Sequence, residues 1–331
     1  MSVLAANAAF DATTAGPPGQ GHRPPLPAGL PSLAVPDRTS DQLPAAEEAA
    51  ERARRLGPVP YSALGPVPGL VLPPAEELAP WTADTIDEIW FGEGRPDPFI
   101  YVEVGAGDGR RARELLKLGP ACLDALRIVL VEDDRTLRES HAEHLSIESP
   151  ALILGPVAPS DDPDEGSRPL PGIGPLVTSL GELPALSTSS AGVVSAYGWL
   201  SRQPSDRYEW RDGTWWEIRL GVVPPADRAL TEIAVPVSEE RARAMQELAG
   251  DRFEGARYAE PVGAVAWLKA ALGTAETGWL LAVDRWTAKL EPLVDDGPTA
   301  IPLEPLASIR QPVSGPSASV THLQVVRWRL G

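Results

Sequence analysis

From about residue 81 onward, continuous apolar runs alternate with stretches of helical periodicity. Phe99–Val104 (FIYVEV) and Arg127–Val131 (RIVLV) are rich in β-branched and aromatic residues, which is typical of strands covered on both faces. An order of strand, helix, strand, helix and strand predicts a parallel sheet flanked by helices. We expect helices over Ala83–Trp90, Arg111–Leu118 and Arg135–Leu145, and a third short strand over Ala151–Leu154.

Two later strands are separated by a long insertion that a bare sheet does not require. We expect these strands over Gly192–Tyr197 and Gly278–Asp284. Inside the insertion, Arg207–Leu220 predicts a hairpin that turns at Asp212-Gly213, where a positive φ is needed. Two helices are then expected, over Glu239–Ala249 and Pro261–Leu272.

The composition of the chain divides it into three parts. Residues 1–44 are proline-rich and are expected to be flexible, because such a stretch neither pairs as a strand nor buries an apolar face. Residues 45–95 form an expected helical extension that begins with a helix over Ala45–Leu56, and residues 96–331 form the main domain. The insertion, at about residues 198–277, is the expected substrate-selecting cap, and Gly155–Gly174 is an expected exposed loop.

Charge, cysteine and histidine content argue against several kinds of partner and site. Acidic residues outnumber basic ones 46 to 29, and the resulting net charge of −17 disfavours nucleic acid and membrane surfaces. The single cysteine, Cys122, rules out an intramolecular disulfide. His141 and His144 are spaced to share a helix face, but no third ligand lies at a convincing spacing, so we predict no metal site. Met1–Phe10 lacks the basic region of a signal peptide, so a cytoplasmic location is expected.

The segment with the most chemical information follows the strand Phe99–Val104. Glu103, Gly105, Ala106, Gly107, Asp108 and Gly109 read E-V-G-A-G-D-G and lead from the strand into a helix. Glycine at every second position lets the main chain approach a ligand closely, and the following helix N-terminus offers unpaired N–H groups. Glu132, with Asp133 beside it, ends the next strand, where a carboxylate can accept hydrogen bonds from both hydroxyls of a ribose. We therefore predict a nucleoside site.

Two kinds of nucleoside cofactor fit such a site, either a dinucleotide such as NAD or S-adenosylmethionine (SAM). A dinucleotide fingerprint requires glycine or alanine at the position of Arg110, because the helix must pack closely on the strand there. The E-x-G-x-G-x-G pattern instead resembles motif I of Rossmann-like SAM methyltransferases. Glu132 suits either cofactor and does not decide between them.

Five stretches, in order, resemble the MidA-like family of SAM-dependent methyltransferases, which includes a mitochondrial complex I assembly factor. They are Gly57–Ser62 (GPVPYS), the glycine loop, Val131–Leu137 (VEDDRTL), Thr178–Pro184 (TSLGELP) and Val193–Leu220, which contains the W-E-I-R-L of the hairpin. The resemblance implies SAM as cofactor, bound by Glu103, Gly105, Ala106, Gly107, Asp108, Gly109, Glu132 and Asp133. It also implies an α/β Rossmann-like sheet with helices on both faces and a hairpin-and-helix cap.

The substrate side departs from the family. In the family, the fourth strand ends in the segment A-N-E-x-x-D-a-L-P. The aligned segment of this chain is A-Y-G-W-L-S-R-Q-P, so Tyr197, Gly198 and Ser201 replace the family's Asn, Glu and Asp. Tyr197 is our candidate catalytic residue, because its hydroxyl could orient an acceptor, although packing explains it equally well. Trp199, Trp210, Trp215 and Trp216 form either the packing of the hairpin or an aromatic wall for a bulky acceptor.

Two hypotheses follow from these patterns. The first is a SAM-dependent methyltransferase acting on a protein, peptide or natural-product acceptor, which could function as a homodimer. The second is a catalytically inactive member that serves as a scaffold or assembly protein, and the substitutions at Tyr197, Gly198 and Ser201 favour it.

Overall fold

The computed structural model describes most of the 331-residue chain. The described residues are 32–34, 43–67, 70–154, 173–186, 192–222, 230–275, 277–293, 300–307, 309–320 and 323–330. The chain divides into two compact units. Unit 1 comprises Met1–Pro68, Arg202–Val265 and Thr287–Ile309, and unit 2 comprises Gly69–Ser201, Ala266–Trp286 and Arg310–Gly331. None of the helices in the described part is long and apolar enough to cross a membrane.

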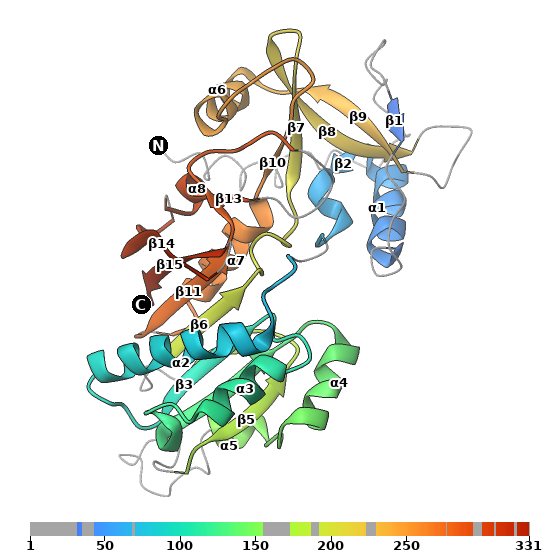
Figure 1. Ribbon diagram of the computed structural model, residues 1–331. Coiled ribbons are helices and arrows are strands. Elements are labelled where there is room, and N and C mark those ends of the chain that lie inside the picture. Colours follow the sequence, from blue (N-terminus) through green and yellow to red (C-terminus); the bar gives the residue numbers. More distant parts are fainter. Residues whose placement is uncertain are drawn as a thin grey trace, which may run out of the picture. The chain divides into compact units, whose positions relative to one another are not determined.

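Unit 2 is built on a seven-stranded sheet with the order β14-β15-β11-β6-β3-β4-β5 (Figure 1). The strands from β11 to β5 run parallel, whereas β15 and β14 extend the sheet antiparallel beyond β11. Their bounds are β3 (Phe99–Val104), β4 (Leu126–Val131), β5 (Leu176–Leu180), β6 (Gly192–Tyr197), β11 (Trp279–Asp284), β14 (Ser314–Val320) and β15 (Leu323–Arg329). The first, second, fourth and fifth parallel strands lie where the sequence predicts them.

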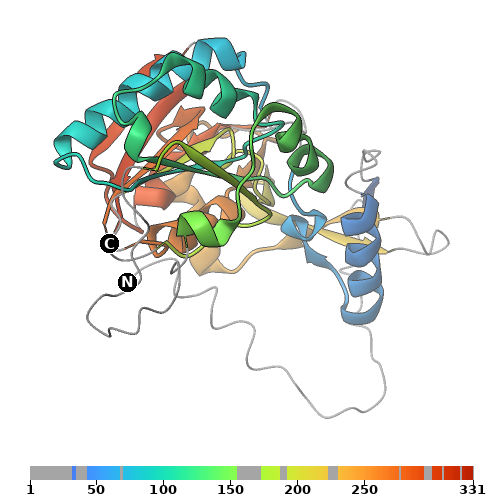
Figure 2. The same ribbon diagram turned by 90° about the horizontal axis from the view of Figure 1, so that it is seen from below.

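The helices of unit 2 cover both faces of this sheet. Apolar side chains of α2 (Ala75–Gly92) and α3 (Arg110–Leu118) share one core cluster with alternate residues of the strands, and Figure 2 shows the two helices over one face. The crossover through α7 (Val262–Leu272) leads from β6 to β11, in the opposite direction along the sheet from β3 to β4. Because such crossovers are right-handed, α7 lies on the other face. The remaining helices are α4 (Arg135–His144) and α5 (Pro150–Leu154), with a 3₁₀ turn at Leu123–Ala125.

The strand order of the parallel sheet reverses between β3 and β6. In open parallel sheets, ligands occupy the crevice at the carboxyl ends of the strands where the order reverses. The glycine loop follows β3, Glu132 follows β4, and the segment from Gly198 to Ser201 follows β6. All three therefore lie at the same edge of the sheet.

Unit 1 is built on an antiparallel sheet with the order β1-β9-β8-β7-β10, to which β2 adds beside β8. The helix α1 (Leu43–Leu56) packs on one face, and α6 (Glu239–Leu248) contributes to the apolar cluster on the other. The strands are β1 (Ser32–Ala34), β2 (Val59–Pro60), β7 (Asp206–Arg211), β8 (Thr214–Val222), β9 (Leu230–Pro236) and β10 (Arg257–Glu260). A 3₁₀ turn at Tyr61–Leu64 follows β2. The chain also forms β12 (Trp286–Thr287), β13 (Ile301–Pro302) and α8 (Leu303–Ala307).

The predicted hairpin is confirmed as β7 and β8. Asp212 and Gly213 both have positive φ, 53° and 71°, as the tight turn requires. The tryptophans of the hairpin pack rather than form a wall, because the Trp215 ring lies between those of Trp210 and Tyr258, at centroid distances of 5.2 and 5.1 Å. Trp216 packs against the α1 side of the sheet, and Trp199 belongs to unit 2.

Two features differ from the sequence-based expectations. Ala151–Leu154 is helical, within α5, and the third parallel strand is Leu176–Leu180. A four-residue apolar run has no period that separates a helix from a strand, which explains the error. In the proline-rich segment, Ser32–Ala34 pairs with β9, which is possible because these three residues include no proline. Most of residues 1–44 and of the loop expected at Gly155–Gly174 lies outside the described residues.

The unit boundaries also differ from those expected. The helix α2, placed by sequence in an N-terminal extension, contributes five residues to the core beneath the sheet of unit 2. The large insertion into that unit spans Arg202–Val265, and Thr287–Ile309 forms a second one. Both insertions join the N-terminal segment in one compact unit, a long-range association that composition alone does not reveal.

Candidate functional site

The glycine loop bends sharply at the carboxyl end of β3. Gly105 has a φ of 73°, and a Cβ there would lie 3.3 Å from Cε3 of Trp199 and 3.4 Å from the carbonyl oxygen of Tyr197. Gly107 has a φ of 60°, but a Cβ there would meet no atom within 4 Å. Gly105 is thus required by the protein's own packing, whereas Gly107 exposes bare main chain to open space. Space of this kind is what a close-lying ligand needs.

Glu132 reaches this loop directly. Its Oε2 accepts a hydrogen bond from the Gly107 amide at 2.8 Å, and its Oε1 accepts one from the Asp134 amide at 3.1 Å. The side chain is only 2% exposed, and burial raises its pKa, with neighbouring Asp133 adding to the rise and the two amides opposing it. The two features that predicted a nucleoside site, separate in sequence, therefore form one structure.

Most amides of the loop are used inside the protein. Those of Gly105 and Ala106 donate to the Val131 carbonyl, and that of Gly109 donates to the Ala106 carbonyl. The amide of Arg110, the first residue of α3, donates to the Asp108 carboxylate at 3.1 Å. The helix N-terminus therefore offers fewer unpaired N–H groups than the sequence predicts. Within the described part of the chain, the Asp108 amide has no acceptor.

Glu103 lies beneath the loop and does not face the open space. It is fully buried, and its Oε1 lies 2.8 Å from Nη2 of Arg111 while its Oε2 accepts a hydrogen bond from the Tyr101 hydroxyl at 3.3 Å. Burial raises the pKa of Glu103, and the charge of Arg111 opposes the rise. Nη2 of Arg111 also donates to the Gly105 carbonyl at 2.9 Å. This ion pair supports the loop from below, so Glu103 acts on the site through the main chain.

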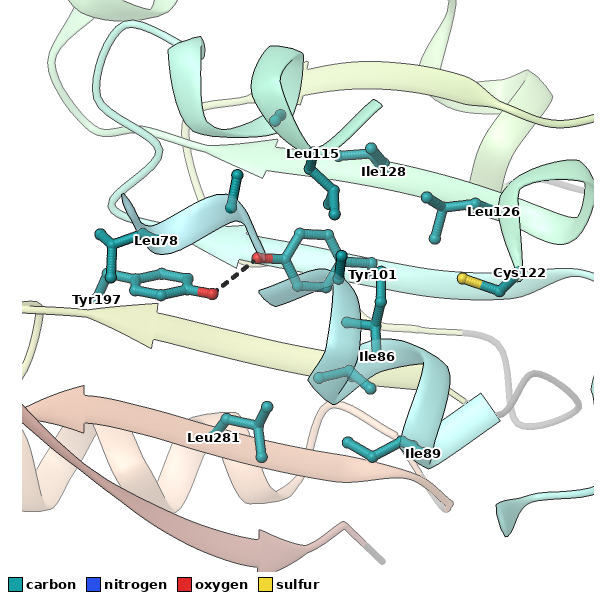
Figure 3. Close-up of a cluster of buried hydrophobic side chains, with 14 of the residues drawn as sticks. Leu78, Ile86, Ile89, Tyr101, Leu115, Cys122, Leu126, Ile128, Tyr197 and Leu281 are labelled. Carbon is teal, nitrogen blue, oxygen red and sulfur yellow. Dashed lines mark hydrogen bonds between the residues drawn. The ribbon is translucent and has the colours of Figure 1, made fainter. Parts of the chain in front are cut away.

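Tyr197 belongs to the core of unit 2. Its side chain is 2% exposed, and its hydroxyl forms a hydrogen bond with the hydroxyl of Thr82 at 2.8 Å. A second bond joins it to the hydroxyl of Tyr101 at 3.2 Å (Figure 3). Arg111 stacks over its ring at 4.1 Å. Burial raises the pKa of Tyr197, so the phenol stays protonated and is unsuited to act as a base. These contacts favour the packing interpretation of Tyr197 over the catalytic one.

Sequence reasoning assigned no role to His141, which contacts the loop from α4. Its Nε2 lies 2.8 Å from the Gly107 carbonyl oxygen, its Nδ1 lies 2.8 Å from the Ser179 hydroxyl, and the ring is fully buried. In the sequence, the three-residue spacing of His141 and His144 indicates only an unconvincing metal site. Among the described residues, no group of three or more histidine, cysteine or acidic side chains could hold a metal ion.

Asp284 is a second residue that sequence reasoning missed. It ends β11, is 1% exposed, and its Oδ2 accepts hydrogen bonds at 3.1 Å from the amides of Leu200 and Ser201. This carboxylate therefore holds the segment after β6, where Trp199 lies against Gly105 and pairs with Trp267 at 6.4 Å. Burial raises the pKa of Asp284 to about 6, and the hydrogen bonds it accepts oppose the rise.

Asp284 should make the stability of the protein depend on pH. Between its ordinary value of 3.8 and about 6, the folded protein keeps a proton that the unfolded chain has released. The free energy of unfolding therefore falls as the pH rises through this window, by up to about 3 kcal/mol. Urea unfolding at pH 4.5, 5.5 and 7 should show this fall for the wild type relative to Asp284→Asn. The exposed-site variant Glu139→Gln should follow the wild type, and a constant difference between wild type and Asp284→Asn would contradict the assignment.

A family model matches residues 78–292, which is more than half of the chain. Its description is "Putative S-adenosyl-L-methionine-dependent methyltransferase". The match covers the glycine loop, Glu132, His141 and Asp284. No curated protein matches the chain in sequence.

Two solved structures from Burkholderia thailandensis are similar to this one. The first is an uncharacterized protein with 18% identity and a TM-score of 0.52, and the match covers 83% of this chain and 78% of that one. The second belongs to the same superfamily and was crystallised with S-adenosyl-homocysteine (SAH). It has 20% identity and a TM-score of 0.51, and the match covers 77% of this chain and 66% of that one. At these identities, the two structures establish the shared fold.

Proposed function

The chain belongs to the family of SAM-dependent methyltransferases whose model it matches, and from this premise we propose that SAM binds against Gly107 with its ribose held by Glu132. The observation that carries the proposal is the hydrogen bond between Glu132 and the Gly107 amide, which joins the two expected cofactor-binding elements. The similar Burkholderia thailandensis structure with bound SAH supports the choice of ligand.

The residues at the carboxyl edge of the sheet fit this cofactor. Gly107 presents main chain with open space in front of it, and the Asp108 amide finds no acceptor among the described residues. Oε2 and Oε1 of Glu132 accept hydrogen bonds from the amides of Gly107 and Asp134, and a carboxylate has about four acceptor sites, so it can also accept from the hydroxyls of a ribose. When bound, SAM supplies an electrophilic methyl group on a sulfonium.

The proposed cofactor residues fall into two groups by the way they act. Gly107, Asp108 and Glu132 would contact the ligand, and the exposed Asp133 would extend the acidic edge beside Glu132. The others shape the loop from inside the protein: Glu103, Gly105, Ala106 and Gly109. Protein residues would then act on the methyl transfer mainly by positioning the acceptor in line with the sulfonium.

For the acceptor, we propose a protein, a peptide or a natural product, and we place the chain in the MidA-like branch of its family. The ordered motifs from Gly57 to Leu220 support this branch. The packing of Tyr197 supports a second candidate, a scaffold that binds SAM without transferring its methyl group, because it leaves this strand end without the family's polar acceptor contacts. Production of SAH from SAM in the presence of candidate acceptors separates the two functions.

Calorimetric titration with SAH tests the cofactor site. Wild-type protein should bind SAH with micromolar affinity, and Glu132→Ala should lose about tenfold or more in affinity, because charge-assisted hydrogen bonds to the ribose are lost. Glu139→Gln, which changes an exposed carboxylate on α4, is the matched control and should bind like the wild type. Wild-type protein that gives no binding signal with SAH or SAM would overturn the proposal.

A further inference from the structure

His141 holds the peptide that carries the Asp108 amide. The carbonyl oxygen of Gly107 only accepts hydrogen bonds, so the Nε2 atom that lies 2.8 Å from it must carry the proton. Burial lowers the pKa of His141, so the ring is neutral and its Nδ1 accepts a hydrogen bond from the Ser179 hydroxyl. The imidazole thus connects β5, which carries Ser179, to the glycine loop.

Because the peptide is planar and trans, the contact of His141 with the Gly107 carbonyl also sets the direction of the next amide, that of Asp108. The carbonyl of Gly107 and the amide of Asp108 share one peptide plane and point in opposite directions. Because His141 draws the carbonyl inward, the Asp108 N–H points away from α4. In the described part of the chain this N–H finds no acceptor, whereas Gly105, Ala106, Gly107 and Gly109 all donate within the protein.

The two sides of Gly107 are therefore held by different elements. Glu132, at the end of β4, accepts from its amide, and His141, on α4, donates to its carbonyl. The packing around the ring is close as well, since a Cβ on Gly109 would lie 3.2 Å from Cδ2 of His141. Glycine alone leaves the main chain free to rotate at residue 107, so these two contacts fix the orientation that the loop takes.

We propose that His141 is a positioning residue for the cofactor site: by holding the Gly107 carbonyl, it aims the Asp108 amide at the bound SAM as a hydrogen-bond donor. The inference rests on the proposed function. It adds His141 to the proposed SAM site, beside the glycine loop and the ribose-binding carboxylate Glu132. The group that the Asp108 amide would meet is an acceptor atom of the cofactor.

Two substitutions separate positioning from simple packing. Glutamine places an amide nitrogen close to the position of Nε2 and keeps the bond to Gly107, whereas asparagine reaches only the position of Nδ1 and keeps the bond to Ser179. Both remove the ring, so both should lower the thermal stability to a similar extent. His141→Asn should weaken SAH binding about tenfold, the order expected for one lost hydrogen bond, and His141→Gln should stay within about threefold of wild type.

A second readout needs no ligand. Amide hydrogen exchange at residues 105–109 of the unliganded protein should be faster in His141→Asn than in wild type and His141→Gln, because the Gly107 peptide is no longer held. Ser179→Ala removes the other bond of the ring and should change SAH affinity by less than about threefold. Equal SAH affinities for His141→Asn and His141→Gln would overturn the inference and leave the proposed function intact. Wild-type protein that binds no SAH would overturn both.

Discussion

Replacing Gly107 with arginine should abolish SAH binding and leave the protein folded. The backbone at this position has a φ of 60°, which costs an L-residue about 1 kcal/mol, and the new side chain meets no protein atom within 4 Å at its Cβ. The side chain instead enters the open space in front of the main chain, where SAM is proposed to lie. Calorimetric titration should therefore show no SAH binding, while circular dichroism and the melting temperature stay close to those of the wild type.

Gly119 provides a matched control for this substitution. It ends α3 with a φ of 61°, and a Cβ there also meets no atom within 4 Å. Gly119→Arg therefore introduces the same backbone strain and the same charge at a position outside the proposed site. It should bind SAH like the wild type. Retained SAH binding by Gly107→Arg, or equal losses in both variants, would contradict the proposed location of the cofactor.

The sequence predicts those parts of the site that depend on a few consecutive residues. Glu103–Gly109 leads from a strand into a helix within a few residues, and Glu132 ends the next strand, so topology alone brings both to one edge. The turn at Asp212 and Gly213 is predictable for the same reason, because the backbone conformation depends on those two residues. Four of the five parallel strands and most helices follow from hydrophobic period, whereas the third parallel strand, β5, does not.

The supporting contacts could not be predicted, because they join residues far apart in the chain. His141 meets Gly107 and Ser179 through a helix whose rotation is set by packing. Asp284 holds Leu200 and Ser201 from a strand that follows the whole insertion. Tyr197 shows the same limit, since its position at a strand end indicated a site while its hydroxyl turns into the core toward Thr82.

Replacing Arg111 with leucine should cause a large loss of stability. Arg111 is the counter-ion of the fully buried Glu103 and also donates to the Gly105 carbonyl. Removal of one partner of a buried ion pair leaves an uncompensated charge, which typically costs about 3–5 kcal/mol. Urea unfolding followed by circular dichroism should show this decrease in the free energy of unfolding.

The double variant Glu103→Leu with Arg111→Leu tests the reason for that loss. Apolar side chains in place of both partners remove the buried charge as well as its compensation, so the double variant should recover most of the stability that Arg111→Leu loses. The Tyr101 hydroxyl would still have Tyr197 as a hydrogen-bond partner. SAH affinity should not recover in parallel, because the Gly105 carbonyl has lost its donor in both variants. A double variant no more stable than Arg111→Leu would show that the arginine stabilises unit 2 by packing and stacking on Tyr197, and not by neutralising Glu103.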